Sequence, residues 1–187
     1  MVAPSKFAHV VYNTHRYDEM IEWYRFVFEA DVVHRNPAIA FLTYDDEHHR
    51  FAFANMGPVP DGEETPSKRR GVGVNHVAYT FSDLGELVDH YERLKGRDIV
   101  PNAPVRHGMT LSMYYADPDG NSMEFQVDLM TADEATRFME SPAFEANPIG
   151  EPFDPDELLR RFRADDDLDD VVFRSDQEPF SLAALRG

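Results

Sequence analysis

The stretch Tyr114-Tyr115-Ala116-Asp117-Pro118-Asp119-Gly120-Asn121-Ser122-Met123-Glu124-Phe125-Gln126-Val127 has the composition of two strands joined by a short loop. Its centre is typical of a turn, because proline fixes φ at one position and Gly or Asn accepts positive φ at another. The flanking aromatic and β-branched residues predict an antiparallel hairpin. Glu124 lies inside the second strand. An unpaired buried carboxylate costs several kcal/mol, so this group should be paired, protonated or bound to metal.

The chain also contains an internal repeat. Residues 6–12 match residues 73–79, which aligns His9 with His76 at an offset of 67. Without gaps, the same offset pairs Glu19 with Glu86, Tyr24 with Tyr91, Asp31 with Asp98, Val33 with Val100, and Pro37 with Pro104. Chance does not hold one register over roughly thirty residues, so we expect two copies of one folding unit.

Each copy is predicted to be a β-α-β-β-β module. A strand surrounds the histidine, apolar residues at helical spacing follow, and an extended piece leads into a hairpin. In the first copy the helix, extended piece and hairpin strands are predicted at residues 18–28, 31–33, 38–44 and 50–55. In the second copy they are predicted at residues 82 or 83 to 94, 98–100, 110–116 and 122–127.

The predicted fold class is therefore α+β, with two βαβββ modules that pair around a cavity. The modules span about residues 6–56 and 72–128 of a domain at 1–130, joined by a linker at 56–71 that is rich in Pro, Gly and charge. Residues 131–187 form a helical and irregular acidic extension, with 15 acidic against 6 basic side chains. In it we expect helices at 132–139 and 154–163, and a solvated loop rather than a calcium site at 165–170.

Composition narrows the classes of function. The 187 residues are 42% apolar, contain no Cys and carry a net charge of −17. The charge argues against nucleic acid and anionic membranes as partners, and the absence of Cys excludes thiolate chemistry. No apolar run approaches the ~18 residues of a membrane span. We expect a cytoplasmic protein and a homo-oligomer, with the extension covering the cavity or supporting a dimer.

The repeat and the hairpin together suggest a metal site. His9 and His76 occupy equivalent positions, so a pseudo-twofold axis would bring them together beside Glu124. Two imidazoles and one carboxylate form the metal-binding face of non-haem Fe(II) oxygenases. The alternative is that both histidines are strand residues satisfied by their neighbours. A histidine duplicated in register, together with a carboxylate inside a strand, favours metal.

Several linked motifs resemble one known family over about residues 6–128. They are Ala8-His9-Val10, His49-Arg50-Phe51-Ala52-Phe53, Asn75-His76-Val77-Ala78-Tyr79, Arg106-His107-Gly108, and the stretch from Tyr114 to Glu124. This pattern is similar to the vicinal oxygen chelate superfamily and, within it, to type I extradiol ring-cleaving dioxygenases such as catechol 2,3-dioxygenase and 2,3-dihydroxybiphenyl 1,2-dioxygenase. Family enzymes commonly carry two paired-module domains, so this chain resembles a one-domain member.

The resemblance implies roles for individual residues. His9, His76 and Glu124 would be the ligands of Fe(II), with Mn(II) as an alternative metal. His49 would be the acid–base residue beside the oxygen site. Tyr114 would hydrogen-bond the substrate, and His107 would be a neighbouring pocket residue, although its spacing to Tyr114 is two residues short of the family pattern.

The expected activity is cleavage of a catechol ring by O2. A vicinal diol can chelate through two oxygens and leave one metal position for O2. A histidine such as His49 can take and return a proton, and His48 is expected on the opposite face because strand side chains alternate. An aryl-substituted or bicyclic catechol is expected from an apolar pocket predicted at Phe41, Phe51, Phe53, Met109 and Met113.

Two other functions fit the same fold. A glyoxalase-like isomerase or lyase would use a fourth protein ligand, usually a Glu on the last strand of the first module. Residues 50–55 contain no carboxylate, which favours the dioxygenase. A non-catalytic protein that binds aromatic ligands would usually lack the metal triad.

Overall fold

The computed structural model describes residues 2–59 and 72–176. The chain divides into two compact units, Met1–Val72 with Asp117–Asn121, and Gly73–Ala116 with Ser122–Gly187. Most of the predicted linker at 56–71 and the end of the extension lie outside the described residues.

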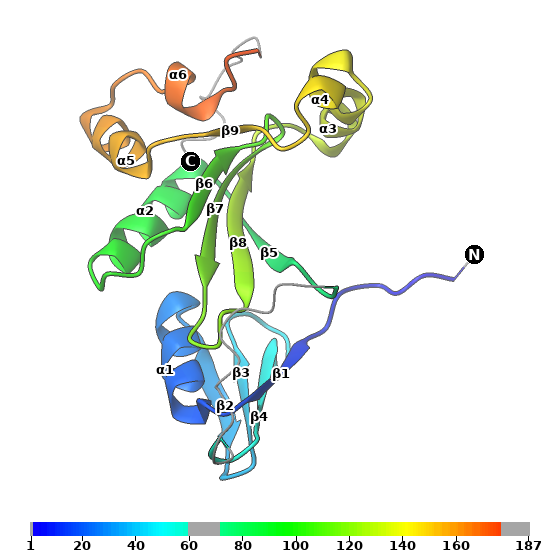
Figure 1. Cartoon of the computed structure of the whole chain (residues 1–187), viewed down its shortest axis with the longest axis vertical. Helices are drawn as coiled ribbons and strands as arrows, with labels where there is room; N and C mark the ends of the chain where they lie inside the picture. Colours follow the sequence, from blue (N-terminus) through cyan, green and yellow to red (C-terminus); the bar gives the residue numbers. More distant parts are fainter. Residues whose placement is uncertain (1, 60–71, 177–187) are drawn as a thin grey trace. The chain divides into compact units, whose positions relative to one another are not determined.

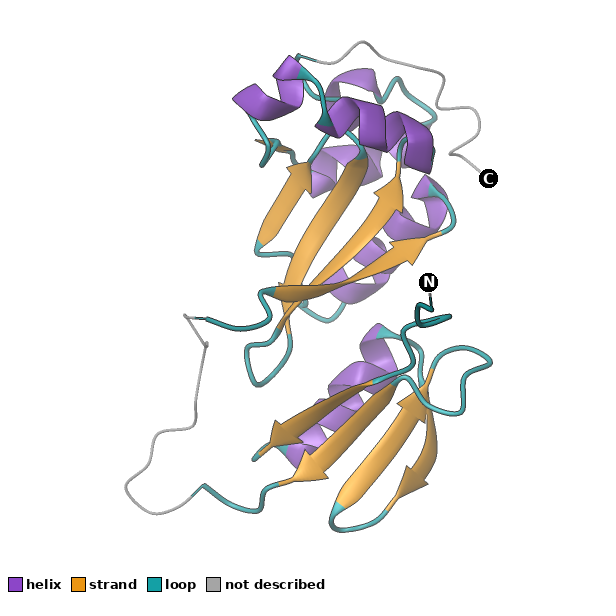
Figure 2. Ribbon diagram, turned by 90° about the vertical axis from the view of Figure 1, so that its right-hand side faces the viewer, coloured by secondary structure: helices purple, strands orange, loops and turns teal. Residues whose placement is uncertain are grey.

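The first unit is a four-stranded sheet with one helix against it (Figure 2). Its strands run in the order β1-β4-β3-β2, with β1 parallel to β4 and the other pairs antiparallel. Its elements are β1 (Val10–Thr14), α1 (Tyr17–Val27), β2 (Asp31–Arg35), β3 (Ile39–Thr43) and β4 (Phe51–Asn55). The helix buries Met20, Ile21 and Tyr24 completely. These elements confirm the predicted βαβββ order for the first module.

The second unit repeats this arrangement around a five-stranded sheet (Figure 1). Its order is β5-β8-β7-β6-β9, in which β5 is parallel to β8 and β9 belongs to the extension. Its elements are β5 (His76–Phe81), α2 (Leu84–Lys95), β6 (Ala103–Arg106), β7 (Thr110–Ala116), β8 (Ser122–Asp128) and β9 (Glu151–Pro152). The hairpin predicted from the opening stretch is confirmed as β7 and β8.

The hairpin register decides which side chains face α2 and which face away from it. Met113, Tyr115 and Phe125 are at most 1% exposed and belong to the core that α2 covers. Tyr114 lies directly opposite Glu124 across the β7–β8 pair. Because strand side chains alternate, these two residues share the face that α2 does not cover.

The hairpin loop is held by one carboxylate. Asp117 Oδ1 accepts hydrogen bonds from the backbone N–H groups of Asp119 and Asn121, and Gly120 adopts φ +80°. A positive φ at this position is readily available to Gly and costs other residues more, which is the turn chemistry predicted from the sequence.

One predicted strand is absent from the second module. The repeat predicts an extended segment at residues 98–100, as in their counterparts in β2, and this prediction is wrong. The end of α2 continues into turns, with Asp98 at φ +58° and the N–H of Ile99 bonded to the carbonyl of Leu94. The edge strand β6 therefore starts later, at Ala103.

The extension packs within the second unit. It contains α3 (Ala132–Met139), α4 (Pro142–Ala146), β9, α5 (Pro155–Ala164) and α6 (Asp169–Val172), and α3 and α5 confirm the two predicted helices. The expected loop at 165–170 is partly wrong, because α6 begins inside it. On α5, Arg163 Nε donates to Glu92 Oε2 of α2 at 3.1 Å. Within residues 2–59 and 72–176, none of the helices combines the length and apolarity that a membrane crossing requires.

His90 makes the stability of the second unit depend on pH. It lies on α2, is 6% exposed, and has its ring 4.3 Å from that of Phe125. Burial, followed by the charge of Arg93, lowers its pKa from 6.5 to about 3. Between these two values the unfolded chain binds a proton that the folded chain does not, so the free energy of unfolding falls as pH falls through this window.

We expect the His90→Leu variant to lose this pH dependence. Between pH 7 and pH 5 wild type should lose about 2 kcal/mol of unfolding free energy through this group, and the variant should not. Urea denaturation at both pH values measures the difference. His34→Leu, which removes an exposed histidine on β2, should retain the wild-type loss. An equal loss in wild type and His90→Leu would contradict a buried neutral imidazole.

Candidate active site

Four of the predicted site residues lie together on the uncovered face of the second sheet. His76 starts β5, Glu124 lies in β8, Tyr114 lies in β7, and His107 follows β6. His76 Nε2 is 3.0 Å from Glu124 Oε2, and His107 Nε2 is 3.8 Å from Glu124 Oε1. The ring of Tyr114 stands edge-on to that of His76, with 5.2 Å between their centroids.

The contact between His76 and Glu124 suits a cation. His76 Nδ1 is 2.7 Å from Asn75 Oδ1, an oxygen that only accepts, so Nδ1 carries a proton. Nε2 faces a carboxylate that is only 5% exposed as a residue. Either a proton or a metal ion must satisfy both atoms. Imidazole nitrogen with carboxylate oxygen is a donor set that Fe(II) and Mn(II) accept.

Tyr114 is a protonated hydrogen-bond donor in this site. Burial, followed by the hydrogen bond to Glu124 and the negative charge of that residue, raises the pKa of Tyr114 well above its ordinary value. The hydroxyl also lies 3.0 Å from His107 Nε2. Its single proton therefore faces a carboxylate and an imidazole, and a ligand oxygen placed among them would meet both donors and acceptors.

The tautomer of His107 follows from its other contact. His107 Nδ1 lies 2.6 Å from the carbonyl oxygen of Ile149, which can only accept. Nδ1 therefore carries a proton, and in the neutral ring Nε2 is the acceptor that faces Tyr114.

The remaining histidines form a separate group in the first unit. His9 precedes β1 and is exposed. The ring of His49 lies 4.4 Å from that of His9 and 4.7 Å from that of Phe41. Burial, followed by the charges of His9 and His48, lowers the pKa of His49. His49 is thus a neutral base beside a predicted metal ligand.

The predicted orientation of His48 is wrong. Its Nδ1 lies 2.6 Å from His49 Nδ1, so the two side chains lie on the same side rather than on opposite faces. The strand β4 starts only at Phe51, and alternation does not apply to the loop before it.

Part of the predicted apolar pocket is also wrong. Phe51, Phe53 and Met113 are at most 1% exposed and lie in the two helix-covered cores. Phe51 and Phe53, for example, pack edge-on against Tyr24 of α1. Their alternation along the strands directs them towards the helices, whereas Phe41 remains beside His49.

The predicted triad draws one ligand from the first unit and two from the second. In the part of the chain that the structure describes, no three His, Asp or Glu side chains form a group that could hold a metal ion. His76 and Glu124 are brought together within the second unit, and His9 lies with His49 in the first. The role of His9 as third ligand stays a prediction.

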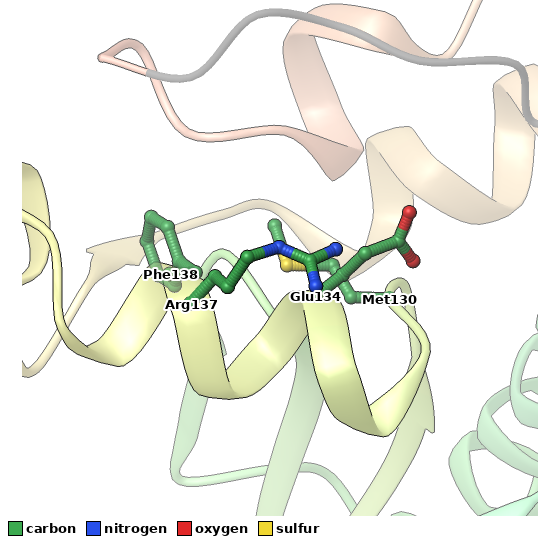
Figure 3. A pocket seen from close by; sticks show the side chains of 4 residues that line it. All are labelled: Met130, Glu134, Arg137 and Phe138. Atoms are coloured by element: carbon green, nitrogen blue, oxygen red, sulfur yellow. The ribbon is translucent and has the colours of Figure 1, made fainter.

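A cavity of about 300 Å³ lies along α3 of the extension (Figure 3). Met130, Glu134, Arg137 and Phe138 line it, and none of them was predicted to act in the site. The hollow therefore does not coincide with the cluster around Glu124.

Three residues that support the site were not predicted. Asn75 holds the Nδ1 proton of His76, and an amide next to a candidate ligand is a signal that the sequence contained. Ile149 acts through its backbone carbonyl on His107, and Arg174 donates to the carbonyl of His107. Every residue has a backbone carbonyl, so contacts of this kind cannot be predicted from the type of residue.

Comparison with known proteins agrees with this fold. The family model described as the Glyoxalase/Bleomycin resistance protein/Dioxygenase superfamily matches residues 6–125. Biphenyl-2,3-diol 1,2-dioxygenase 2 of Rhodococcus globerulus is 46% identical over 83% of this chain and 80% of its own. Biphenyl-2,3-diol 1,2-dioxygenase 3 of the same organism is 42% identical over 88% of this chain and 85% of its own.

A solved structure shares the fold at low sequence identity. The glyoxylase/bleomycin resistance protein/dioxygenase domain from Frankia sp. has a TM-score of 0.55 and 15% identity, and the match covers 67% of this chain and 99% of that one. The family match, the two relatives and the shared fold confirm the superfamily that the sequence motifs resembled. This chain belongs to the Glyoxalase/Bleomycin resistance protein/Dioxygenase superfamily.

Proposed function

We propose that this chain is an extradiol dioxygenase that cleaves a catechol ring with O2. The observation that carries the proposal is the cluster of His76, Glu124, Tyr114 and His107 on one face of a sheet. The two Rhodococcus relatives, both biphenyl-2,3-diol 1,2-dioxygenases by name, support an aryl-substituted catechol as the substrate.

The metal of the proposed enzyme would be held by His9, His76 and Glu124. Fe(II) is the proposed ion, and Mn(II) accepts the same nitrogen and oxygen ligands. When bound, the ion supplies Lewis-acid stabilisation of the deprotonated diol and brings the two reactants together. Asn75 keeps the His76 ring in the tautomer whose Nε2 is free to bind, which is the usual arrangement around a metal-binding histidine.

The other residues would bind the substrate and move protons. Tyr114, protonated at neutral pH, would donate its single proton to a substrate oxygen, and His107 Nε2, 3.0 Å from the same hydroxyl, would then be left to accept a hydrogen bond from the substrate. His49 is neutral and lies beside His9. Because its Nδ1 contacts His48, its Nε2 is the nitrogen that would take a hydroxyl proton and return it.

The two alternatives make different demands on these residues. A glyoxalase-like isomerase would need a fourth protein ligand, and β4 (Phe51–Asn55) supplies no carboxylate. A non-catalytic binder would have no need for the metal ion that His76 and Glu124 are proposed to hold. Both features favour the dioxygenase.

The proposed enzyme is also a homo-oligomer. The strand β2 lies at the edge of the first sheet, all five of its residues are exposed, and two of them are the apolar Val32 and Val33. Exposed apolar edges are surfaces that proteins commonly cover by association. Sedimentation of the full chain should show more than one copy per particle.

The activity is tested by loading the protein with Fe(II) under anaerobic conditions, adding biphenyl-2,3-diol and then admitting air. We expect a yellow ring-fission product, with one O2 consumed for each diol. Omitting the iron is the control and should give no colour. Tight binding of the diol without colour or O2 uptake would contradict the proposal and favour a non-catalytic binder.

A further inference from the structure

We infer that the C-terminal extension positions His107 in the site and that Arg174 is the residue that holds it there. The inference deepens the proposed function, on which the catalytic part of its test rests. Its basis is that the extension contacts each residue of the tripeptide Arg106-His107-Gly108, between β6 and β7.

Arg106 is joined to the extension by backbone and side chain. The strand β9 pairs with β6, so that Arg106 lies opposite Glu151. Arg106 Nη2 lies 3.1 Å from Glu151 Oε2, and Arg106 Nη1 donates to the carbonyl of Asp170. Glu151 in turn accepts a hydrogen bond from the backbone N–H of Ser175, at 3.0 Å. The end of β6 is therefore tied to two segments of the extension.

His107 itself is held at two atoms. Its Nδ1 donates to the carbonyl of Ile149 at 2.6 Å, and its own carbonyl accepts from Arg174 Nη1 at 3.4 Å. The same Nη1 donates to the carbonyl of Asn147 at 2.8 Å. Arg174 thus links the backbone of His107 to the loop whose Ile149 fixes the His107 ring.

Two glycines allow the extension to come this close. A Cβ at Gly108 would lie 2.6 Å from the ring of Phe138 on α3. A Cβ at Gly150, where φ is +94°, would lie 2.3 Å from the carbonyl oxygen of Arg106. At Gly150 the obstructing atoms are backbone, so a larger residue there requires the backbone to move, whereas at Gly108 the obstruction is the Phe138 side chain. The loop at Gly150 is therefore fitted against the residue that precedes His107.

The guanidinium of Arg174 is buried, which costs free energy, and its nitrogens are hydrogen-bonded. Its side chain is 0% exposed, and its Nε and Nη2 bind the two carboxylate oxygens of Asp176 at 2.8 and 2.6 Å. Its guanidinium lies 5.6 Å from the centroid of Phe138. Only the arginine of this pair is buried, because the Asp176 side chain is 41% exposed, so the five donors of a buried guanidinium are held by Asp176 and by backbone carbonyls around it. One of these carbonyls is that of His107, so the contacts of Arg174 hold the His107 loop.

These contacts determine the direction in which the His107 ring points. With Nδ1 held by Ile149, the opposite nitrogen of His107 points at the Tyr114 hydroxyl, 3.0 Å away. If the extension released the loop, the ring could rotate away from Tyr114 and Glu124. A catalytic group misplaced by about 1 Å can cost about 10²-fold in rate.

The test uses Arg174→Met and Gly150→Ala in the full chain. Because loss of a buried cation can unfold a protein, Gly150→Ala, which leaves Arg174 in place, is the second variant. The first readout is the NMR signal of the hydrogen-bonded Nδ1–H of His107 in ¹⁵N-labelled protein, identified by its loss in His107→Gln. The second readout comprises kcat, KM and iron content with biphenyl-2,3-diol as substrate.

We expect the His107 signal to be absent from both variants. Their kcat should fall about 10²-fold, and their iron content should be unchanged. Arg174→Lys, which retains the charge, should recover part of both. The matched controls are Arg160→Met, on the exposed side of α5, and Gly57→Ala, where φ is +71° and a Cβ would meet nothing within 4 Å. Both controls should keep the wild-type His107 signal and kcat, although alanine at position 57 is strained by the positive φ.

The outcomes separate this inference from the proposed function. If the His107 signal persists in both folded variants, or kcat is unchanged when the signal is lost, the positioning role is overturned. If wild type lacks dioxygenase activity but both variants lose the signal, the placement of His107 by the extension stands and the proposed function fails.

Discussion

Glu124→Gln should give a folded protein that neither retains iron nor cleaves catechols. The substitution preserves the size of the side chain and removes the charge that would face the metal together with His76. Loss of residues that only support metal ligands typically costs about 10–100-fold in metal affinity, so loss of a direct ligand should exceed ~10²-fold. Iron content after anaerobic loading and gel filtration measures the effect.

The control for this variant is Asp128→Asn. Asp128 lies four positions further along β8, on the same face as Glu124, and is exposed. It should retain wild-type iron and activity, which would show that the effect belongs to one carboxylate rather than to the acidity of the strand. If Glu124→Gln retains the wild-type iron content, Glu124 is not a metal ligand.

His49→Gln should retain iron but lose about 10²–10⁴-fold in kcat, the usual contribution of one positioned acid–base group. Glutamine can occupy the place beside His9 and Phe41 but cannot take and return a proton. Steady-state rates on biphenyl-2,3-diol, together with metal analysis of the same samples, separate proton transfer from metal binding.

His34→Gln is the matched control for His49, because His34 is an exposed histidine of the same unit, on β2. It should have the wild-type rate. A fall of less than threefold in kcat for His49→Gln would refute a role for His49 in proton transfer, whatever the metal content.

Much of the fold could be predicted because the repeat and the turn chemistry are local in sequence. The hairpin around Asp117 to Asn121 follows from residues whose backbone preferences are strong, and α2 follows from apolar residues at helical spacing. The missing strand at 98–100 shows the limit of the repeat. After α2 the backbone turns at Asp98, and nothing in its counterpart Asp31 indicates this.

The extension was the least predictable part. The strand β9 has two residues, and its partner β6 lies more than forty positions earlier, so no local pattern marks it. The acidic run at 165–170 suggested a solvated loop, yet Val171 and Val172 directly after it are buried. Their burial depends on tertiary contacts that a composition-based argument does not contain.

The residue types of the candidate site could be read from the sequence, but the contacts that hold these residues in place could not. A duplicated histidine and a carboxylate within a strand pointed to His76 and Glu124, which lie 3.0 Å apart. The predicted orientation of His48 is wrong because strand alternation does not hold for residues that precede β4. Arg174 was not predicted, because a surface arginine and a fully buried one look alike in sequence.

In the proposed site, two imidazoles and one carboxylate hold one metal ion. X-ray absorption at the iron edge can count the imidazoles on anaerobically loaded wild type, His9→Gln and His76→Gln. We expect the scattering signature of two imidazoles in wild type and of one in each variant that still holds iron. If the iron of wild type has fewer than two imidazole ligands, or if either variant keeps the wild-type number, the proposed ligand set is wrong.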